Sequence, residues 1–122
     1  MNIENIFAKN MELTPAIEER VQTRVAKLAK LTKRLQPVSI KVEVGKPSQH
    51  HNKGEDVFYA EFSVKVPGMD FYSSKSEPDL YKAIEKVRDD MYRQIVTWKR
   101  KEQGKERRGG SMLKRLMRFG RE

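Results

Sequence analysis

Two adjacent histidines and a cluster of serines are the residues in this chain that first suggest catalysis or metal binding. His50 and His51 lie in the polar loop 45–56. Zinc sites combine histidine with cysteine or with carboxylates at fixed spacings, and neither accompanies this pair, so a solvated loop explains it better. The serines have no base partner in the pattern and are explained by a strand and a helix cap (Ser73, Ser74 and Ser76).

Phosphate-binding and nucleophilic motifs are also missing from the sequence. The stretch GKPS at 45–48 lacks the upstream glycine of a phosphate loop, and there is no GxGxxG. The chain has no cysteine, which excludes disulfides and thiolate chemistry. We therefore expect a protein that is not an enzyme, with no metal, cofactor or small-molecule substrate.

Positive charge is the strongest chemical feature of the chain. The net charge is +9, and the segment from Lys99 onward holds ten Lys or Arg against three Glu, leaving a net +2 for the rest. Basic segments attract polyanions by releasing their counterions, so nucleic acid or anionic lipid is the expected partner, with solubility alone as the alternative. We expect an α+β domain over residues 1–102 and a basic, flexible tail over 103–122.

The first helix is predicted from Thr14, a suitable N-cap, and Pro15, suited to the first helical position. Pro37 is predicted to stop it. One apolar stripe recurs at helical spacing (Ile17, Val21, Val25, Leu28, Leu31 and Leu35). A basic ridge follows one flank of this stripe (Arg20, Lys27 and Arg34, with Lys30 beside them).

Four strands are predicted from alternating apolar residues. Residues 2–10 form a weakly patterned first strand, and 38–44 and 57–66 alternate cleanly. The Pro67-Gly68 turn then joins the third strand to a short fourth strand at 69–74, forming a hairpin. Tyr59 and Tyr72 fall on the opposite face from the apolar residues, where cross-strand packing is favoured over stacking on RNA bases.

The second helix is predicted to open with a capping box at Ser76–Asp79 and to end at Gly104. Its apolar stripe includes Trp98, which we expect to pack on the core (Leu80, Ile84, Val87, Met91, Ile95 and Trp98). Its basic residues gather on the opposite face (Lys82, Lys86, Arg93 and Arg100).

The element order is therefore β-α-β-β-β-α, an α+β fold. Two helices with one apolar stripe each must cover one face of a four-stranded sheet, side by side, with their basic ridges outward.

Two stretches carry a family resemblance: KNMELTPAIEERVQTRVAKLAKL and DLYKAIEKVRDDMYRQIVTWKRK. They resemble the ribosome hibernation-promoting factors, also called ribosome-associated inhibitor A or sigma-54 modulation proteins. The resemblance spans about residues 1–101 and implies a fold like that of double-stranded-RNA-binding domains. It also implies binding to 16S rRNA in the channel between head and body of the small ribosomal subunit, where mRNA and tRNA would sit.

Matched residue by residue, the resemblance implies rRNA contacts from both helices (Arg24, Lys27, Lys30, Arg93, Lys99 and Lys101). Arg20, Arg34, Lys82, Lys86 and Arg100 join the candidate set from the helical pattern alone. The chain departs from the family in carrying Leu80, Lys82 and Glu85 where the family has Met, Ala and Asp. Asp90 stands where relatives often carry lysine, which argues against an RNA contact there.

The chain resembles a short family member, since it has no room for the C-terminal dimerisation domain of the long forms. We expect a cytoplasmic protein, monomeric when free, with no secretory signal and no apolar run long enough to cross a bilayer.

The tail is predicted to add nucleic-acid contacts through Lys105, Arg107 and Arg108. The segment from Met112 to Phe119 is basic and amphipathic if helical, although disorder is favoured for so short an isolated segment. The alternative function is therefore a protein-interaction regulator that docks through this tail.

Overall fold

The computed structural model describes residues 5–47 and 58–120, with side chains described for 6–47 and 58–104. The loop that carries His50 and His51 lies outside these ranges. The elements follow the predicted order: β1 (Asn5–Lys9), α1 (Pro15–Leu31), β2 (Ser39–Gly45), β3 (Phe58–Val66), β4 (Met69–Glu77) and α2 (Leu80–Gly120).

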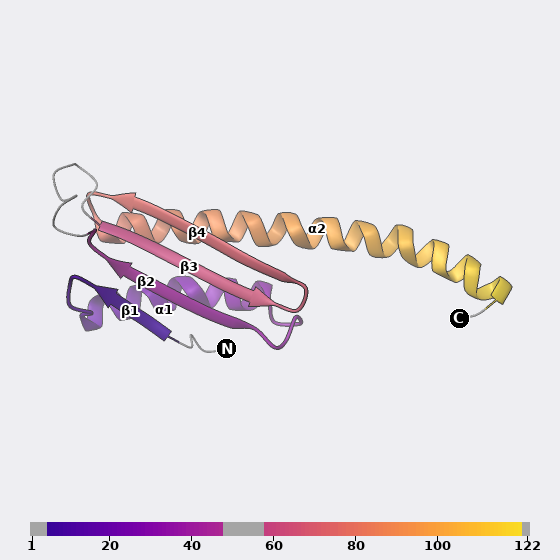
Figure 1. The fold of residues 1–122 in the computed structure, drawn as a ribbon, viewed down its shortest axis with the longest axis horizontal. Coiled ribbons are helices and arrows are strands. Elements are labelled where there is room, and N and C mark those ends of the chain that lie inside the picture. The colour runs from indigo at the N-terminus through magenta and orange to yellow at the C-terminus, as the bar shows by residue number, and fades with distance from the viewer. Residues whose placement is uncertain (1–4, 48–57, 121–122) are drawn as a thin grey trace.

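The four strands form one mixed sheet in the order β1-β2-β3-β4 (Figure 1). β1 pairs with β2 in parallel, so that Asn5 lies opposite Lys41, and the other two pairs are antiparallel. The predicted hairpin between β3 and β4 is confirmed, with Val66 opposite Met69 and Gly68 at φ 86° in the turn. β4 continues to Glu77 and is longer than predicted.

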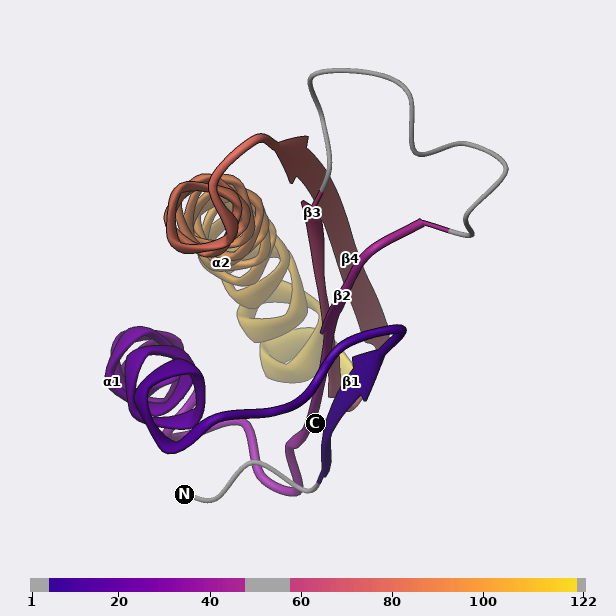
Figure 2. The same cartoon turned by 90° about the vertical axis from the view of Figure 1, so that its left-hand side faces the viewer.

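Both helices cover the same face of the sheet, as Figure 2 shows with the two helices in near end-on view. The alternating residues Ile40, Val42 and Val44 of β2 and Ala60, Phe62 and Val64 of β3 are buried at that face, together with the apolar stripes of the helices. Burial of each isoleucine, valine or phenylalanine among them stabilises the fold by roughly 1.5–3 kcal/mol. The α+β fold predicted from the sequence is therefore confirmed.

Trp98 packs against the buried core as predicted, although its own side chain is only partly buried. Its ring lies 5.6 Å from the ring of Phe71, centroid to centroid, at an interplanar angle of 81°. This is the edge-to-face geometry that aromatic pairs favour.

The start of α1 is confirmed and its end is corrected. Thr14 caps the helix, since its hydroxyl oxygen accepts a hydrogen bond of 3.2 Å from the backbone N–H of Ile17. The helix ends at Leu31 rather than near Pro37. Thr32 closes it: its hydroxyl donates to the carbonyl oxygen of Leu28 at 3.0 Å, an acceptor near the helix end. Leu35 and Arg34 therefore lie in the connection after the helix.

The start of α2 also differs from the prediction. Ser76 does not cap a helix, because it lies in β4 opposite Tyr59. The cap is Asp79, whose Oδ1 accepts a hydrogen bond of 2.9 Å from the N–H of Tyr81. Pairing with β3 continues to Glu77 and delays the helix by one turn.

The end of α2 is corrected as well, since the helix does not end at Gly104. It continues through Gly104 to Gly120 and extends well beyond the sheet (Figure 1). A glycine inside a helix costs about 1 kcal/mol relative to alanine, which neighbouring Lys, Glu and Arg residues with good helix propensity offset. Within the described ranges, no helix has both the length and the apolar composition needed to cross a membrane.

Candidate nucleic-acid interface

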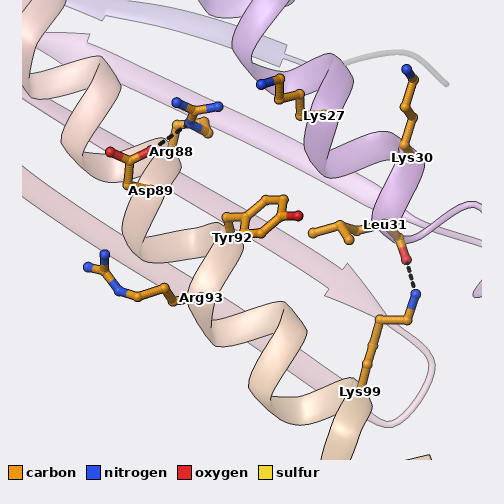
Figure 3. A pocket seen from close by; sticks show the side chains of 8 residues that line it. All are labelled: Lys27, Lys30, Leu31, Arg88, Asp89, Tyr92, Arg93 and Lys99. Atoms are coloured by element: carbon orange, nitrogen blue, oxygen red, sulfur yellow. Dashed lines mark hydrogen bonds and ion pairs between the residues drawn. The ribbon is translucent and has the colours of Figure 1, made fainter.

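A cationic groove runs between the two helices on their solvent side. It has a volume of about 600 Å³. We call it the interhelical groove, and Figure 3 shows its lining: Lys27, Lys30 and Leu31 from α1, and Arg88, Asp89, Tyr92, Arg93 and Lys99 from α2. Five of these eight side chains are cationic and one is acidic. The groove therefore presents a net positive surface.

Two sets of contacts hold the helices in parallel register. Near their starts, Arg20 and Arg24 of α1 bind Glu85 of α2. Near the end of α1, Lys99 Nζ donates a hydrogen bond of 2.8 Å to the carbonyl oxygen of Leu31 (Figure 3). Lys99 thus satisfies a carbonyl that the helix leaves unpaired, and places a cation at the negative end of the helix dipole. Lys99, which was predicted to contact RNA, therefore also connects the two helices.

Lys27 and Lys30 are the cations of the interhelical groove that are most available to a ligand. Both are exposed, and neither side chain has an ion-pair or hydrogen-bond partner among the residues that the structure describes. Arg93 is also available, with its side chain 69% exposed and its guanidinium 3.7 Å from Asp90. In Figure 3, Arg93 extends on the side of α2 that faces away from α1. These three predicted residues are brought to one surface.

Arg88 also lines this groove, and the sequence patterns did not single it out. Its side chain is 18% exposed, and its guanidinium lies 2.9 Å from Asp89 and 3.6 Å from Glu85. The contact from Nε to Asp89 is an ion pair without hydrogen-bond geometry. The available signal was its position on the helical wheel, between the apolar stripe and the outer face, which is the side that meets α1.

Arg20 and Arg24 are partly committed to the contact between the helices. The Arg20 guanidinium lies 3.3 Å from Oε2 of Glu85 and 4.7 Å above the ring of Tyr81. Arg24 Nε lies 2.5 Å from the same carboxylate oxygen. Their side chains remain 37% and 32% exposed, so they extend the cationic surface beyond the groove. Their ion pairs with Glu85 offset part of the positive charge that they present.

The remaining predicted residues do not join this groove. Lys82 and Arg100 are exposed on the outer face of α2, and Arg34 is exposed after α1. Lys86 binds Glu77 of β4 at 2.6 Å, and Lys101 lines a different groove. The side chains of Lys105, Arg107 and Arg108 lie outside the described residues, although their backbone belongs to α2.

Asp90 faces the sheet rather than the ligand surface. Its Oδ2 accepts hydrogen bonds from the Ser73 hydroxyl at 2.6 Å and from the Gln94 amide at 3.0 Å. The bond from Ser73 is the main cause that lowers the pKa of the Asp90 carboxyl, helped by Gln94 and by the charges of Lys75 and Arg93, and opposed by burial. Asp90 therefore fixes α2 to β4.

The outer face of the sheet supports packing rather than base stacking at Tyr59. Its hydroxyl donates to Oε2 of Glu43 on the neighbouring strand at 2.5 Å. Burial, followed by this hydrogen bond and the charge of Glu43, raises the pKa of the Tyr59 hydroxyl. Tyr72 is 56% exposed on the same face. Within the described ranges, no group of three or more His, Cys, Asp or Glu residues could hold a metal ion.

These features define an α+β binding domain. Two parallel helices cover one face of a mixed four-stranded sheet, and cations line the junction between the helices. The chain matches the family described as sigma 54 modulation protein / S30EA ribosomal protein over residues 5–103, and it belongs to that family. This is a family of ribosome hibernation factors, which are binding proteins rather than enzymes.

Curated relatives and solved structures agree with this assignment. The chain is 33% identical over 94 residues to a ribosome hibernation promoting factor of Acinetobacter guillouiae, covering 74% of this chain and 80% of the relative. It is 33% identical over 91 residues to the ribosome-associated factor Y of Haemophilus influenzae, covering 75% and 77%. The N-terminal domain of Thermus thermophilus Protein Y superposes with a TM-score of 0.64 at 27% identity, covering 80% of this chain and 99% of that domain.

Proposed function

We propose that this chain is a ribosome hibernation factor that binds the small ribosomal subunit through the basic surface of its two helices. Its site would be the channel occupied by mRNA and tRNA, with 16S rRNA as the direct ligand. The family membership supports ribosome binding. The observation that carries the surface assignment is the interhelical groove, where Lys27, Lys30 and Arg93 are exposed together.

The mechanism follows from charge and shape. Exposed lysine and arginine side chains neutralise RNA phosphates and release bound counterions, which gives affinity without sequence readout. The domain then excludes mRNA and tRNA by occupying their volume. No covalent step is involved. The protein is therefore released by simple dissociation, or when mRNA or tRNA competes for the channel.

Sedimentation with purified small subunits tests this function. The full chain is expected to co-sediment at low salt and to dissociate as salt rises, because counterion release weakens with salt concentration. Added mRNA should compete with it. Absence of co-sedimentation at any salt concentration, or binding that mRNA leaves unaffected, would contradict the proposed site.

A second candidate function is supported by the end of α2. The helix continues to Gly120, beyond the sheet, and its last part has the sequence of a basic amphipathic helix. Such a segment suits a partner protein, which would make this chain a protein-interaction regulator.

Truncation after Gly104 separates the two functions. If the tail adds sequence-independent affinity for RNA, the truncated chain should still bind small subunits at the same place, with an affinity loss that is larger at low salt. If the full and the truncated chain bind small subunits with equal affinity at both a low and a high salt concentration, the partner-protein function is favoured for the segment beyond Gly104.

A further inference from the structure

A second groove lies on the flank of α2 that faces β4, away from α1. We call it the Trp98 groove, and it has a volume of about 500 Å³. Its lining includes Met69 and Phe71 of β4 and Arg93, Thr97, Trp98 and Lys101 of α2. Trp98 does not line the interhelical groove, and among the lining residues the two grooves share only Arg93.

The Trp98 groove combines an aromatic floor with two cations. Trp98 is held in place by Phe71, whose own side chain is almost fully buried at 2% exposure. Arg93 and Lys101 are eight positions apart on α2, a rise of about 12 Å, and Trp98 lies between them along the helix axis. An apolar peptide would offer no negative charge to Lys101 or to Arg93, whose only ion pair among the described residues is the 3.7 Å contact with Asp90. A nucleotide offers a base to the indole and phosphates to the two cations.

Arg93 connects this groove to the interhelical groove, because it lines both. Its side chain is 69% exposed and extends away from α1 (Figure 3). An RNA backbone bound along the helix pair therefore has a cation at the point where it would cross to the β4 side of α2. The side-chain amide of the neighbouring Gln94 donates hydrogen bonds to the Tyr72 carbonyl oxygen and to the Asp90 carboxylate, and these bonds fix this wall of the groove.

We propose that the Trp98 groove takes one unpaired RNA base, stacked against the Trp98 indole, with the adjoining phosphates at Arg93 and Lys101. The proposal rests on the proposed function, since it assumes that the helix pair binds RNA. It adds a preference for single-stranded over duplex RNA, because a paired base is not free to enter the groove.

The fluorescence of Trp98 tests this directly, because it is the only tryptophan of the chain. The full chain is titrated with a short single-stranded RNA, with a duplex of the same sequence, and with inorganic polyphosphate. Stacking of a base on the indole should quench its emission with the single strand. Polyphosphate and duplex should bind in a salt-dependent manner with little quenching. Equal emission changes with all three ligands, or none with the single strand, would overturn the proposal.

Two variants give an independent readout through the anisotropy of a labelled single-stranded RNA. Trp98→Leu keeps an apolar side chain but removes the stacking surface, and we expect about tenfold weaker binding of the single strand with unchanged binding of polyphosphate. Lys101→Gln should weaken single-strand binding more than the matched control Lys41→Gln, which lies on the far face of the sheet. If Trp98→Leu fails to fold, the binding of Lys101→Gln and the fluorescence quenching of the unmodified chain still test the proposal. Equal effects of both lysine variants would contradict the proposal.

The outcome for the proposed function is separate. Salt-dependent binding of small subunits with no response of Trp98 to single-stranded RNA would leave the proposed function standing and overturn the base-binding groove. Quenching by single-stranded RNA without any binding to small subunits would do the reverse, supporting the groove and contradicting the ribosomal site.

Discussion

The Nε atom of Arg24 lies 2.5 Å from Oε2 of Glu85, and this ion pair joins α1 to α2 across 61 residues of sequence. The same oxygen lies 3.3 Å from Arg20, and the other carboxylate oxygen lies 3.6 Å from Arg88. One carboxylate therefore neutralises part of the charge of three arginines beside the candidate RNA surface. Glu85 influences both helix packing and the availability of positive charge.

Replacing Glu85 by Gln should have opposite effects on stability and on polyanion binding. The three arginines lose their shared partner and repel one another, so the free energy of unfolding should fall by about 1 kcal/mol. RNA binding should strengthen, because the same arginines become available to phosphates. Urea unfolding and filter binding measure the two effects. Glu19→Gln, which makes the same charge change at an exposed position of α1, is the control, and equal RNA affinities of the two variants would contradict this role.

Reversing Lys27 and Arg93 to Glu should weaken binding to small subunits while leaving the fold intact. Both side chains are exposed, so little packing is lost. Each lost phosphate contact should reduce the slope of log affinity against log salt by about one unit, a value measured for duplex DNA. Filter-binding titrations at several salt concentrations measure this slope. Lys41→Glu on the outer face of the sheet is the matched control, and unchanged affinity of the double variant would exclude the interhelical groove as the binding surface.

Replacing Trp98 by Ala should destabilise the fold by about 2 kcal/mol, less than the roughly 3–5 kcal/mol typical of a fully buried aromatic residue. The side chain packs on the core and against Phe71, but it is only partly buried. Chemical denaturation measures the loss. Trp98→Phe retains a ring and should cost less than about 1.5 kcal/mol. If the Ala variant is as stable as the unmodified chain, Trp98 is not part of the packing.

Asp90 should make the stability of the chain depend on pH in the acid range. Its pKa is lowered in the folded state from the ordinary value of 3.8, so its stabilising contribution is present above that value and complete by about pH 5. The contribution is lost as pH falls through the folded-state pKa. Urea unfolding from pH 6 to pH 2 should therefore show a steeper acid loss for the unmodified chain than for Asp90→Asn. Asp70→Asn, at an exposed position of the β3–β4 hairpin, should leave the profile nearly unchanged, and parallel profiles for all three proteins would contradict this assignment.

The fold was predictable wherever local pattern and tertiary packing agree. Thr14 and Pro15 fixed the start of α1, and alternation in β2 and β3 identified the buried face. The misplaced boundaries arose where a longer-range interaction prevailed. Pairing with β3 holds Ser76 in a strand. The hydroxyl of Thr32 binds the carbonyl oxygen of Leu28 and ends α1 several residues before Pro37, which was predicted to end it.

The candidate site was predictable in composition but not in arrangement. Lys27, Lys30 and Arg93 were identified from helical periodicity, yet their position at one groove depends on how α1 and α2 pack. The same packing explains the omission of Arg88 and the partial commitment of Lys99 to Leu31. Helical periodicity places Lys99 and Lys101 on different flanks of α2, but it does not tell which flank faces α1 and which faces β4.

The parallel pairing of β1 with β2 has a consequence for the order in which the molecule folds. Asn5 must reach Lys41 across the whole of α1, whereas Val66 meets Met69 across a tight turn. Closing a longer stretch of chain costs more entropy, so we expect the β3–β4 hairpin to form early and β1 to dock last. β1 also pairs on one side only. The amide protons of β1 should therefore exchange with solvent fastest among those in the sheet, and protection in β1 equal to that in β3 would show that the sheet opens as a single unit.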